Sequence, residues 1–214
     1  MQKKMRDFAF KIGLSITDNA LEKLALYADL VWQKKDFLNL TSVCSKQEIF
    51  SRHLCDGLSA AAFLNKKTQG GVFSVADMGS GAGYIGLTIA ITLPQVKVTL
   101  VESLEKRCSF MNWAILKLGL QNVTVSCARL GQKEVGTFDF VTERAMGQIN
   151  DILPLIAPCV KEGGFFIPYQ SDPHEAKKDL LTRLNLSKQT PVAYTLPEEN
   201  KERFLAVFQK EWIS

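Results

Sequence analysis

Short runs of β-branched residues alternate with helical runs from residue 72 to the end of the chain, and this alternation restricts the fold more than any other feature. Such an order is typical of a parallel sheet with helices on both faces. Strands are expected at 72–77, 96–102, 123–127, 138–142 and 165–169, with a closing antiparallel pair at 192–196 and 204–209. Helices are expected at 83–93, 104–118, 149–160 and 173–184. The sequence therefore predicts an α/β fold with a mostly parallel, doubly wound sheet and an antiparallel closing strand.

Residues 1–68 carry helical periodicity and no strand pattern. Apolar residues recur there at three- and four-residue spacing, and Thr17 supplies N-cap chemistry ahead of them. Ser45 and Glu48 have the spacing of a capping box, which announces a further helix. We therefore expect a helical N-terminal segment that packs as one unit on a sheet domain, residues 69–214.

The composition excludes several classes of protein. The longest apolar stretch, Ile85 to Leu93, is about nine residues, whereas a helix that crosses a bilayer needs about twenty. The five cysteines do not have the spacing of zinc ligands, and reduced thiols are expected. A formal net charge of +4 permits a polyanionic partner without requiring one. We expect a cytoplasmic, monomeric protein without a membrane segment or a metal.

The loop after the first expected strand is rich in glycine. Gly79, Gly81 and Gly83 follow Asp77, and glycines there let the backbone turn tightly and approach a ligand closely. Glu102 ends the next strand about twenty residues further on, where a carboxylate can accept hydrogen bonds from a ribose diol. This pattern fits S-adenosylmethionine, with Asp77 near the amino acid part of the ligand.

The same loop also fits a second ligand class. Gly81, Gly83 and Gly86 satisfy the dinucleotide fingerprint, which uses the same acid after the second strand. A dinucleotide needs a seat for its pyrophosphate, and adenosylmethionine does not. We favour adenosylmethionine and keep a nicotinamide or flavin cofactor, and with it an oxidoreductase, as the alternative.

Four further elements carry a resemblance to a known family. They are Asn39–Leu40–Thr41–Ser42–Val43, Arg52–His53 with Asp56, Glu102–Ser103–Leu104 followed by Lys106–Arg107, and Arg144–Ala145. In this order, and together with the glycine loop, they resemble the bacterial glucose-inhibited division protein B family (RsmG) over nearly the whole chain. Members of that family methylate guanine N7 in small-subunit (16S) ribosomal RNA. The resemblance implies a Rossmann-like class I methyltransferase that uses S-adenosylmethionine and acts on ribosomal RNA or the small ribosomal subunit.

The glycine-loop pattern, the resemblance and the chemistry of the reaction together give a set of expected site residues. Residues expected to bind the methyl donor are Asp77, Gly79, Gly81, Gly83, Tyr84, Glu102, Leu130, Gly131 and Arg144. Residues expected in the catalytic site are Asn39, Asp56 and Arg144. Residues expected to contact the RNA are Arg52, His53, Lys106 and Arg107. The chain departs from the family in having Glu143 where members usually have serine, Gly131 where they have an acid, and Tyr169–Gln170 where they have Lys-Gly.

Methylation of guanine N7 requires neither a general base nor an enzyme nucleophile. The nitrogen has an in-plane lone pair and no proton to lose, so the rate depends on in-line placement and a dry site. We expect Asp56 to accept hydrogen bonds from the purine edge as positive charge moves onto the base. Arg144 is expected to hold guanine O6 or the donor carboxylate. The alternatives are a methyltransferase for another RNA, a protein or a small molecule, and an RNA-binding protein without turnover.

Overall fold

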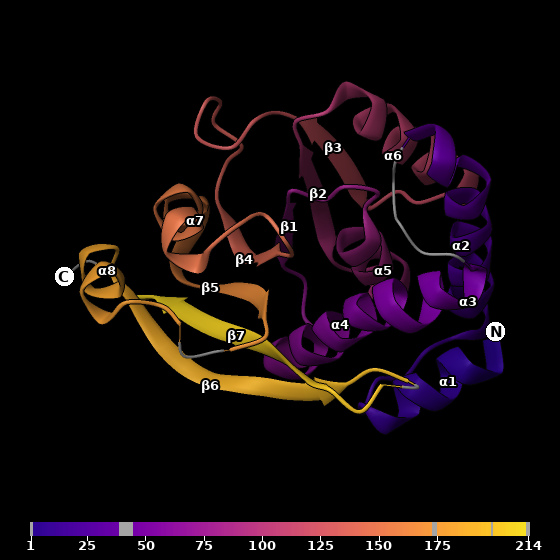
Figure 1. Cartoon of the computed structure of the whole chain (residues 1–214), viewed down its shortest axis with the longest axis horizontal. Helices are drawn as coiled ribbons and strands as arrows, with labels where there is room; N and C mark the ends of the chain where they lie inside the picture. The colour runs from indigo at the N-terminus through magenta and orange to yellow at the C-terminus, as the bar shows by residue number, and fades with distance from the viewer. Residues whose placement is uncertain (1, 39–44, 173–174, 198, 213–214) are drawn as a thin grey trace.

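The computed structural model describes residues 2–38, 45–172, 175–197 and 199–212, and within these residues seven strands form one sheet (Figure 1). Their order across the sheet is β3-β2-β1-β4-β5-β7-β6. Their bounds are β1 Ser74–Met78, β2 Lys97–Glu102, β3 Val123–Cys127, β4 Phe138–Glu143, β5 Val160–Gln170, β6 Leu186–Thr195 and β7 Glu202–Lys210. Strands β1 to β5 run parallel, whereas β7 is antiparallel to both β5 and β6. The predicted fold class is confirmed.

Helices cover both faces of the sheet (Figure 1). One face carries α1 Gln2–Lys11, α2 Asp18–Leu38, α4 Cys55–Thr68, α5 Tyr84–Thr92 and α6 Glu105–Leu118. The other face carries α7 Ile149–Ile156 and α8 Lys178–Arg183. Short pieces are α3 Lys46–Glu48, the π-helix Ile49–Leu54 and the 3₁₀ turn Ala157–Cys159.

Alternating side chains of the central strands fill two separate cores. Val75 and Phe165 belong to the cluster under α1, α2, α4, α5 and α6, whereas their neighbours Ala76 and Phe166 belong to the cluster under α7 and α8. This is the period-two alternation that a sheet buried on both faces requires. The N-terminal helices thus share a core with the sheet, and the domain division after residue 68 stays a prediction.

Local signals at the helix ends are confirmed. The Thr17 hydroxyl accepts a hydrogen bond from the Ala20 amide at 3.2 Å, and the Ser45 hydroxyl accepts one from the Glu48 amide at 3.2 Å. Gly119 ends α6 with a φ of 61°, as a C-terminal glycine does. The helix after Ser45 contains a π-helical turn, which the sequence pattern did not predict and which is frequent at functional sites.

The predicted helix 149–160 and strand 165–169 are wrong at their common boundary. Helix α7 ends at Ile156, and β5 begins at Val160 and includes Gly163–Gly164, which the sequence had placed at a helix end. Pro158 has no amide proton, so it cannot extend the helix. A Cβ atom on Gly164 would lie 2.8 Å from the Asp139 carbonyl oxygen, so close strand packing requires a glycine there.

The closing strands and the last helix also differ in extent from the prediction. Strand β6 begins at Leu186 rather than 192, and its register with β7 shifts between Gln189 and Val192. This irregularity and Pro191 interrupt the alternation of apolar and polar residues from which the strand was predicted. Helix α8 begins only at Lys178. Figure 1 shows β6 and β7 as a long bowed pair that runs from α8 toward α1.

Candidate active site

The glycine loop between β1 and α5 requires residues without a side chain. Gly79, Gly81 and Gly83 have φ angles of 66°, 62° and 87°, a region that other L-residues rarely adopt. A Cβ atom on Gly79 would also lie 2.5 Å from the Met146 side chain. The loop therefore brings bare backbone to the carboxyl ends of the strands, where open α/β sheets bind their ligands.

Asp77 ties this loop to its neighbours from the end of β1. Its side chain is buried, and one carboxylate oxygen accepts the Gly86 amide at 3.0 Å while the other accepts the Thr142 hydroxyl at 3.1 Å. Burial raises the pKa of Asp77 to about 6, although both hydrogen bonds lower it. The carboxylate still lines the adjacent cavity, so it is both a loop anchor and a negative charge at the site.

A second buried carboxyl group lies on the next strand. Glu143 of β4 pairs with Met78 of β1, one residue beyond Asp77. Burial raises the pKa of Glu143 to about 7; the hydrogen bond from the Met146 amide lowers it, and Asp77 raises it further. Two carboxyl groups that burial makes costly to ionise therefore lie at the ends of neighbouring strands, and of the two Asp77 lines the adjacent cavity.

Glu143→Gln should raise the melting temperature at pH 8 and leave it nearly unchanged at pH 4. The folded pKa is above the unfolded value, so the native state binds more protons between about pH 4 and 7, and stability falls as the pH rises through this window. Glutamine keeps an acceptor for the Met146 amide and removes the charge. The expected gain at pH 8 is on the order of 2 kcal/mol, or several degrees, by calorimetry. The exposed variant Glu134→Gln is the control, and an equal gain at both pH values would contradict this account.

Backbone amides hold Glu102 at the end of β2. One carboxylate oxygen accepts the Gly81 amide at 2.9 Å, and the other accepts the Ser103 and Leu104 amides at 2.8 and 3.0 Å. The guanidinium of Arg107 lies 3.7 Å away. The carboxylate is therefore fixed in orientation beside the glycine loop, as a group that recognises a ribose diol must be.

A cavity of about 310 Å³ opens above this loop. Its walls include His53, Asp77, Tyr84, Arg107, Arg144 and the loop residues 79–82. The hydroxyl of Tyr27 on α2 donates a hydrogen bond to the Ala82 carbonyl at 2.8 Å, so the N-terminal helices support the loop from behind. The structure thus brings together predicted residues that are as far apart in the sequence as His53 and Arg144.

His53 and Tyr84 form one wall of this cavity. Their rings stack with centroids 4.2 Å apart, and the Arg144 guanidinium lies 5.6 Å from the Tyr84 ring. Burial, and then the positive charges of Arg144, Arg52 and Arg203, lower the pKa of His53 to about 3. His53 is therefore a neutral, flat surface at physiological pH rather than a proton donor.

Arg144 is held by Asp56, the first acid of α4. An Arg144 Nη donates to Asp56 Oδ2 at 2.7 Å, and the Tyr194 hydroxyl donates to Asp56 Oδ1 at 2.7 Å. The Tyr169 hydroxyl donates to the Asp56 carbonyl at 2.8 Å, and Arg203 lies 3.8 Å from the carboxylate. The Asp56 side chain is 1% exposed. Asp56 also lines the cavity on the far side of Arg144, but both carboxylate oxygens serve neighbours inside the protein, so this geometry favours a positioning role over the expected direct contact with a purine.

A second cavity, of about 270 Å³, lies on the other side of Arg144. Its lining includes Tyr169, Tyr194, Arg203 and Phe204, and it shares Arg144 and Ala145 with the first cavity. Ala145 has a φ of 66°, an uncommon strained conformation for a residue with a side chain. Two chambers therefore meet at the end of β4. The sequence did not predict Tyr194, Arg203 and Phe204 as site residues, because they lie in no motif.

Other predicted site residues lie elsewhere. Leu130 and Gly131 line a separate hollow of about 490 Å³ beside α7, and Lys106 lies exposed on α6. Arg52 is half exposed and lies 3.6 Å from Glu48 and 3.8 Å from Glu199. Asn39 and the rest of its motif, 40–43, lie outside the described residues. Within the described ranges there is no cluster of three potential metal ligands and no helix long and apolar enough to cross a membrane.

Comparison with known proteins shows the family to which the chain belongs. The model of the family described as rRNA small subunit methyltransferase G matches residues 20–204. The chain belongs to this family. Proteins called ribosomal RNA small subunit methyltransferase G are 31% identical over 208 residues in Lachnoclostridium phytofermentans and 32% identical over 207 residues in Bacillus subtilis. The alignments cover 93% and 92% of this chain and 85% of each relative.

Solved structures support the fold class. The magnesium protoporphyrin IX methyltransferase of Synechocystis superposes with a TM-score of 0.64 at 12% identity, over 86% of this chain and 97% of that one. TrmN from Thermus thermophilus superposes with a TM-score of 0.56 at 19% identity, over 72% and 48% of the two chains. At these identities the likeness concerns the fold alone, which is that of class I methyltransferases. The predicted family and fold are confirmed.

Proposed function

We propose that this protein transfers the methyl group of S-adenosylmethionine to N7 of a guanine in small-subunit ribosomal RNA. The observation that carries the proposal is the position of Arg144, which separates two adjoining cavities in a chain of the rRNA small subunit methyltransferase G family. One cavity has the glycine loop and its carboxylates, and the other has aromatic and cationic walls. Its partner would be ribosomal RNA or the small ribosomal subunit in the cytoplasm.

The residues that line the first cavity, with Glu102 beside its glycine loop, fit the methyl donor. Adenosylmethionine has a ribose diol, which Glu102 can accept, and cationic ammonium and sulfonium groups, which the buried charge of Asp77 favours. Positive φ angles keep Gly79 and Gly81 free of side chains where the ligand must lie close. When bound, the donor supplies a methyl group already activated on a sulfonium, so the protein need not provide a nucleophile.

The protein's own groups then have to place the acceptor. Arg144 carries a full charge, because the neighbouring Asp56 raises its pKa against the opposing effect of burial. From the shared wall it can hold guanine O6 while N7 remains free. Neutral His53 and the ring of Tyr84 exclude water, and at neutral pH His53 is not an imidazolium that could protonate N7. The aromatic side chains of the second cavity supply surfaces on which a purine can stack.

The experiment that tests the proposal is methyl transfer from labelled adenosylmethionine to small-subunit ribosomal RNA that lacks its native methyl groups. We expect label in a single guanosine as the N7-methyl product, and loss of at least about 10²-fold in rate for Arg144→Ala, since misplaced reactants lose this much. Arg183→Ala, in α8 away from both cavities, is the matched control. Label at another atom, or in protein rather than RNA, would refute the proposed substrate.

A further inference from the structure

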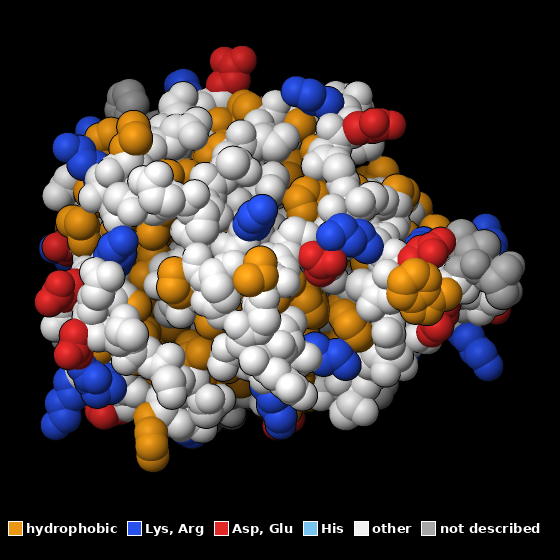
Figure 2. All heavy atoms as spheres, turned by 180° about the vertical axis from the view of Figure 1, so that it is seen from behind, with side chains coloured by type: hydrophobic (Ala, Val, Ile, Leu, Met, Phe, Trp, Pro, Cys, Tyr) orange, Lys and Arg blue, Asp and Glu red, His pale blue; other side chains and the backbone are white. Residues whose placement is uncertain are grey.

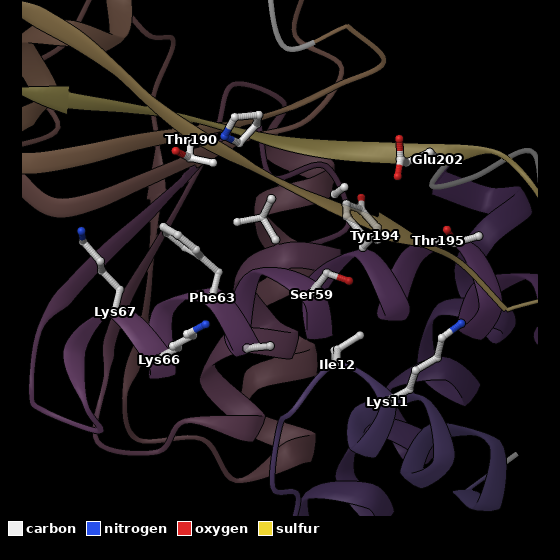
Figure 3. A pocket seen from close by; sticks show the side chains of 14 residues that line it. Lys11, Ile12, Ser59, Phe63, Lys66, Lys67, Thr190, Tyr194, Thr195 and Glu202 are labelled. Atoms are coloured by element: carbon white, nitrogen blue, oxygen red, sulfur yellow. The ribbon is translucent and has the colours of Figure 1, made fainter.

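A groove of about 760 Å³ runs between helix α4 and strand β6 (Figure 3). Helix α4 contributes Phe63, Lys66 and Lys67, the end of α1 contributes Lys11, and β6 contributes residues 190–195. Tyr194 and Glu202 line both this groove and the cavity beside Arg144. The groove thus adjoins the chamber that the acceptor base would enter, with Tyr194 and Glu202 in both linings.

Three lysines give the groove its charge. Lys11 and Lys66 form no ion pair or hydrogen bond with any described residue, and the Lys67 ammonium makes only a cation–π contact, 4.5 Å from the Phe165 ring centroid. Glu202 is the one carboxylate among the described lining residues. By contrast, acidic and basic side chains are interspersed over the face in Figure 2. Uncompensated positive charge along a groove attracts a polyanion.

The wall formed by β6 argues against a peptide as the occupant. Strand β6 is the last strand of the sheet, and its outer side faces no other strand among the described residues. Pro191 lacks an amide proton, and the register shift between Gln189 and Val192 bends the strand, so a regular added strand cannot form there. Isolated backbone amides on such an edge can still donate to phosphate oxygens.

Apolar surface completes the groove. Phe63 points from α4 toward the strands (Figure 3), and Pro191 and Val192 line the same groove. Grooves that bind single-stranded nucleic acid combine cations along the backbone path with flat apolar side chains for the bases. A phosphate chain near the lysines and a base against Phe63 would match both features of the groove.

We propose that the groove between α4 and β6 binds a single-stranded stretch of the substrate RNA next to the target guanine, an inference that rests on the proposed function. Lys11, Lys66 and Lys67 contact phosphates, and Phe63 packs against a base. The path passes Tyr194 and Glu202 into the chamber beside Arg144. Affinity for RNA therefore depends on the groove, whereas the chemical step depends on the chamber.

The test compares two triple variants of equal charge. The groove variant is Lys11→Ala/Lys66→Ala/Lys67→Ala, and the control is Lys97→Ala/Lys117→Ala/Lys178→Ala, at exposed lysines outside every described cavity. The probe is a fluorescent single-stranded oligonucleotide of small-subunit ribosomal RNA sequence, followed by anisotropy. We expect the groove variant to raise Kd by about 10-fold or more, and to reduce the slope of log Kd against log salt by about 2, since each phosphate on a single strand contributes about 0.7.

Further measurements separate the outcomes. Replacing the same three lysines by arginine should restore binding, which distinguishes lost charge from a weakened α4 terminus. The Kd for adenosylmethionine and the kcat at saturating RNA should not change. Equal RNA affinity in the groove and control variants would overturn the inference. So would an effect confined to assembled subunits, which would indicate a protein occupant. If the wild type binds RNA through the groove but does not methylate it, the proposed function is wrong, whereas the inference that the groove binds RNA still holds.

Discussion

Asp56→Asn should lower kcat for methyl transfer by about 10²-fold while changing the Kd for adenosylmethionine by less than about threefold. Asparagine has the shape of aspartate, but it cannot accept from Arg144 and Tyr194 and also provide the charge that opposes the guanidinium. Arg144 would then leave the wall between the cavities. Donor binding is spared because the glycine loop and Glu102 make no hydrogen bond with Asp56.

A double-mutant cycle shows whether Asp56 acts through the arginine. If it does, Asp56→Asn combined with Arg144→Ala should be no slower than Arg144→Ala alone, since residues that act as one unit are not additive. Tyr194→Phe, which removes one hydrogen bond to the carboxylate, should cost far less, about two- to tenfold. Asp56→Ala is a poorer probe, because an unpaired charge in a buried pair costs about 3–5 kcal/mol of stability. Additive effects in the cycle would contradict the positioning role and favour direct contact with the base.

The glycine loop could be predicted from the sequence and the partners of Asp56 could not, because the two sets of contacts differ in sequence separation. The loop and its acid are local: Gly81 and Glu102 are 21 residues apart and belong to one strand–helix–strand unit. The partners of Asp56 are distant in sequence. Arg144, Tyr169 and Tyr194 are separated from Asp56 by 88, 113 and 138 residues. Their meeting depends on the order β4-β5-β7-β6, which no short pattern encodes.

The closing strands also change the role of a predicted residue. The sequence predicted that Asp56 accepts hydrogen bonds from the base, and no motif indicated that the closing strands pack over it. The antiparallel β7 and β6 bring Arg203 and Tyr194 over the start of α4, and these side chains bury the carboxylate. The chain has Tyr169–Gln170 where family members usually have Lys-Gly. This difference also contributes to the burial of Asp56, because the Tyr169 hydroxyl donates a hydrogen bond to the Asp56 carbonyl. The chamber that we propose for the acceptor base is therefore lined by Tyr169 of β5 and by Tyr194 and Arg203 of the closing strands.

Glu102→Gln should raise the Kd for adenosylmethionine by about 10²-fold, the largest effect on donor binding that we expect from a single polar substitution. Hydrogen bonds to a charged group contribute about 1.5–3 kcal/mol each, and 1.4 kcal/mol corresponds to a tenfold change in Kd. The carboxylate accepts three backbone amides and would also accept the ribose diol. An amide side chain has one acceptor oxygen, so it would leave at least one backbone amide facing an NH₂ group.

Calorimetry with adenosylmethionine measures this effect, and Glu105→Gln, an exposed acid in the first turn of α6, is the control. RNA affinity of the Glu102 variant should match that of the wild type, because the groove between α4 and β6 does not include this residue. A change in donor Kd below about threefold would mean that the ribose is held elsewhere. Because a dinucleotide would use the same acid, the wild type must be titrated with a nicotinamide dinucleotide in parallel. Binding of the sulfonium ligand alone assigns the loop to methyl transfer, whereas tighter binding of the dinucleotide would assign it to hydride transfer.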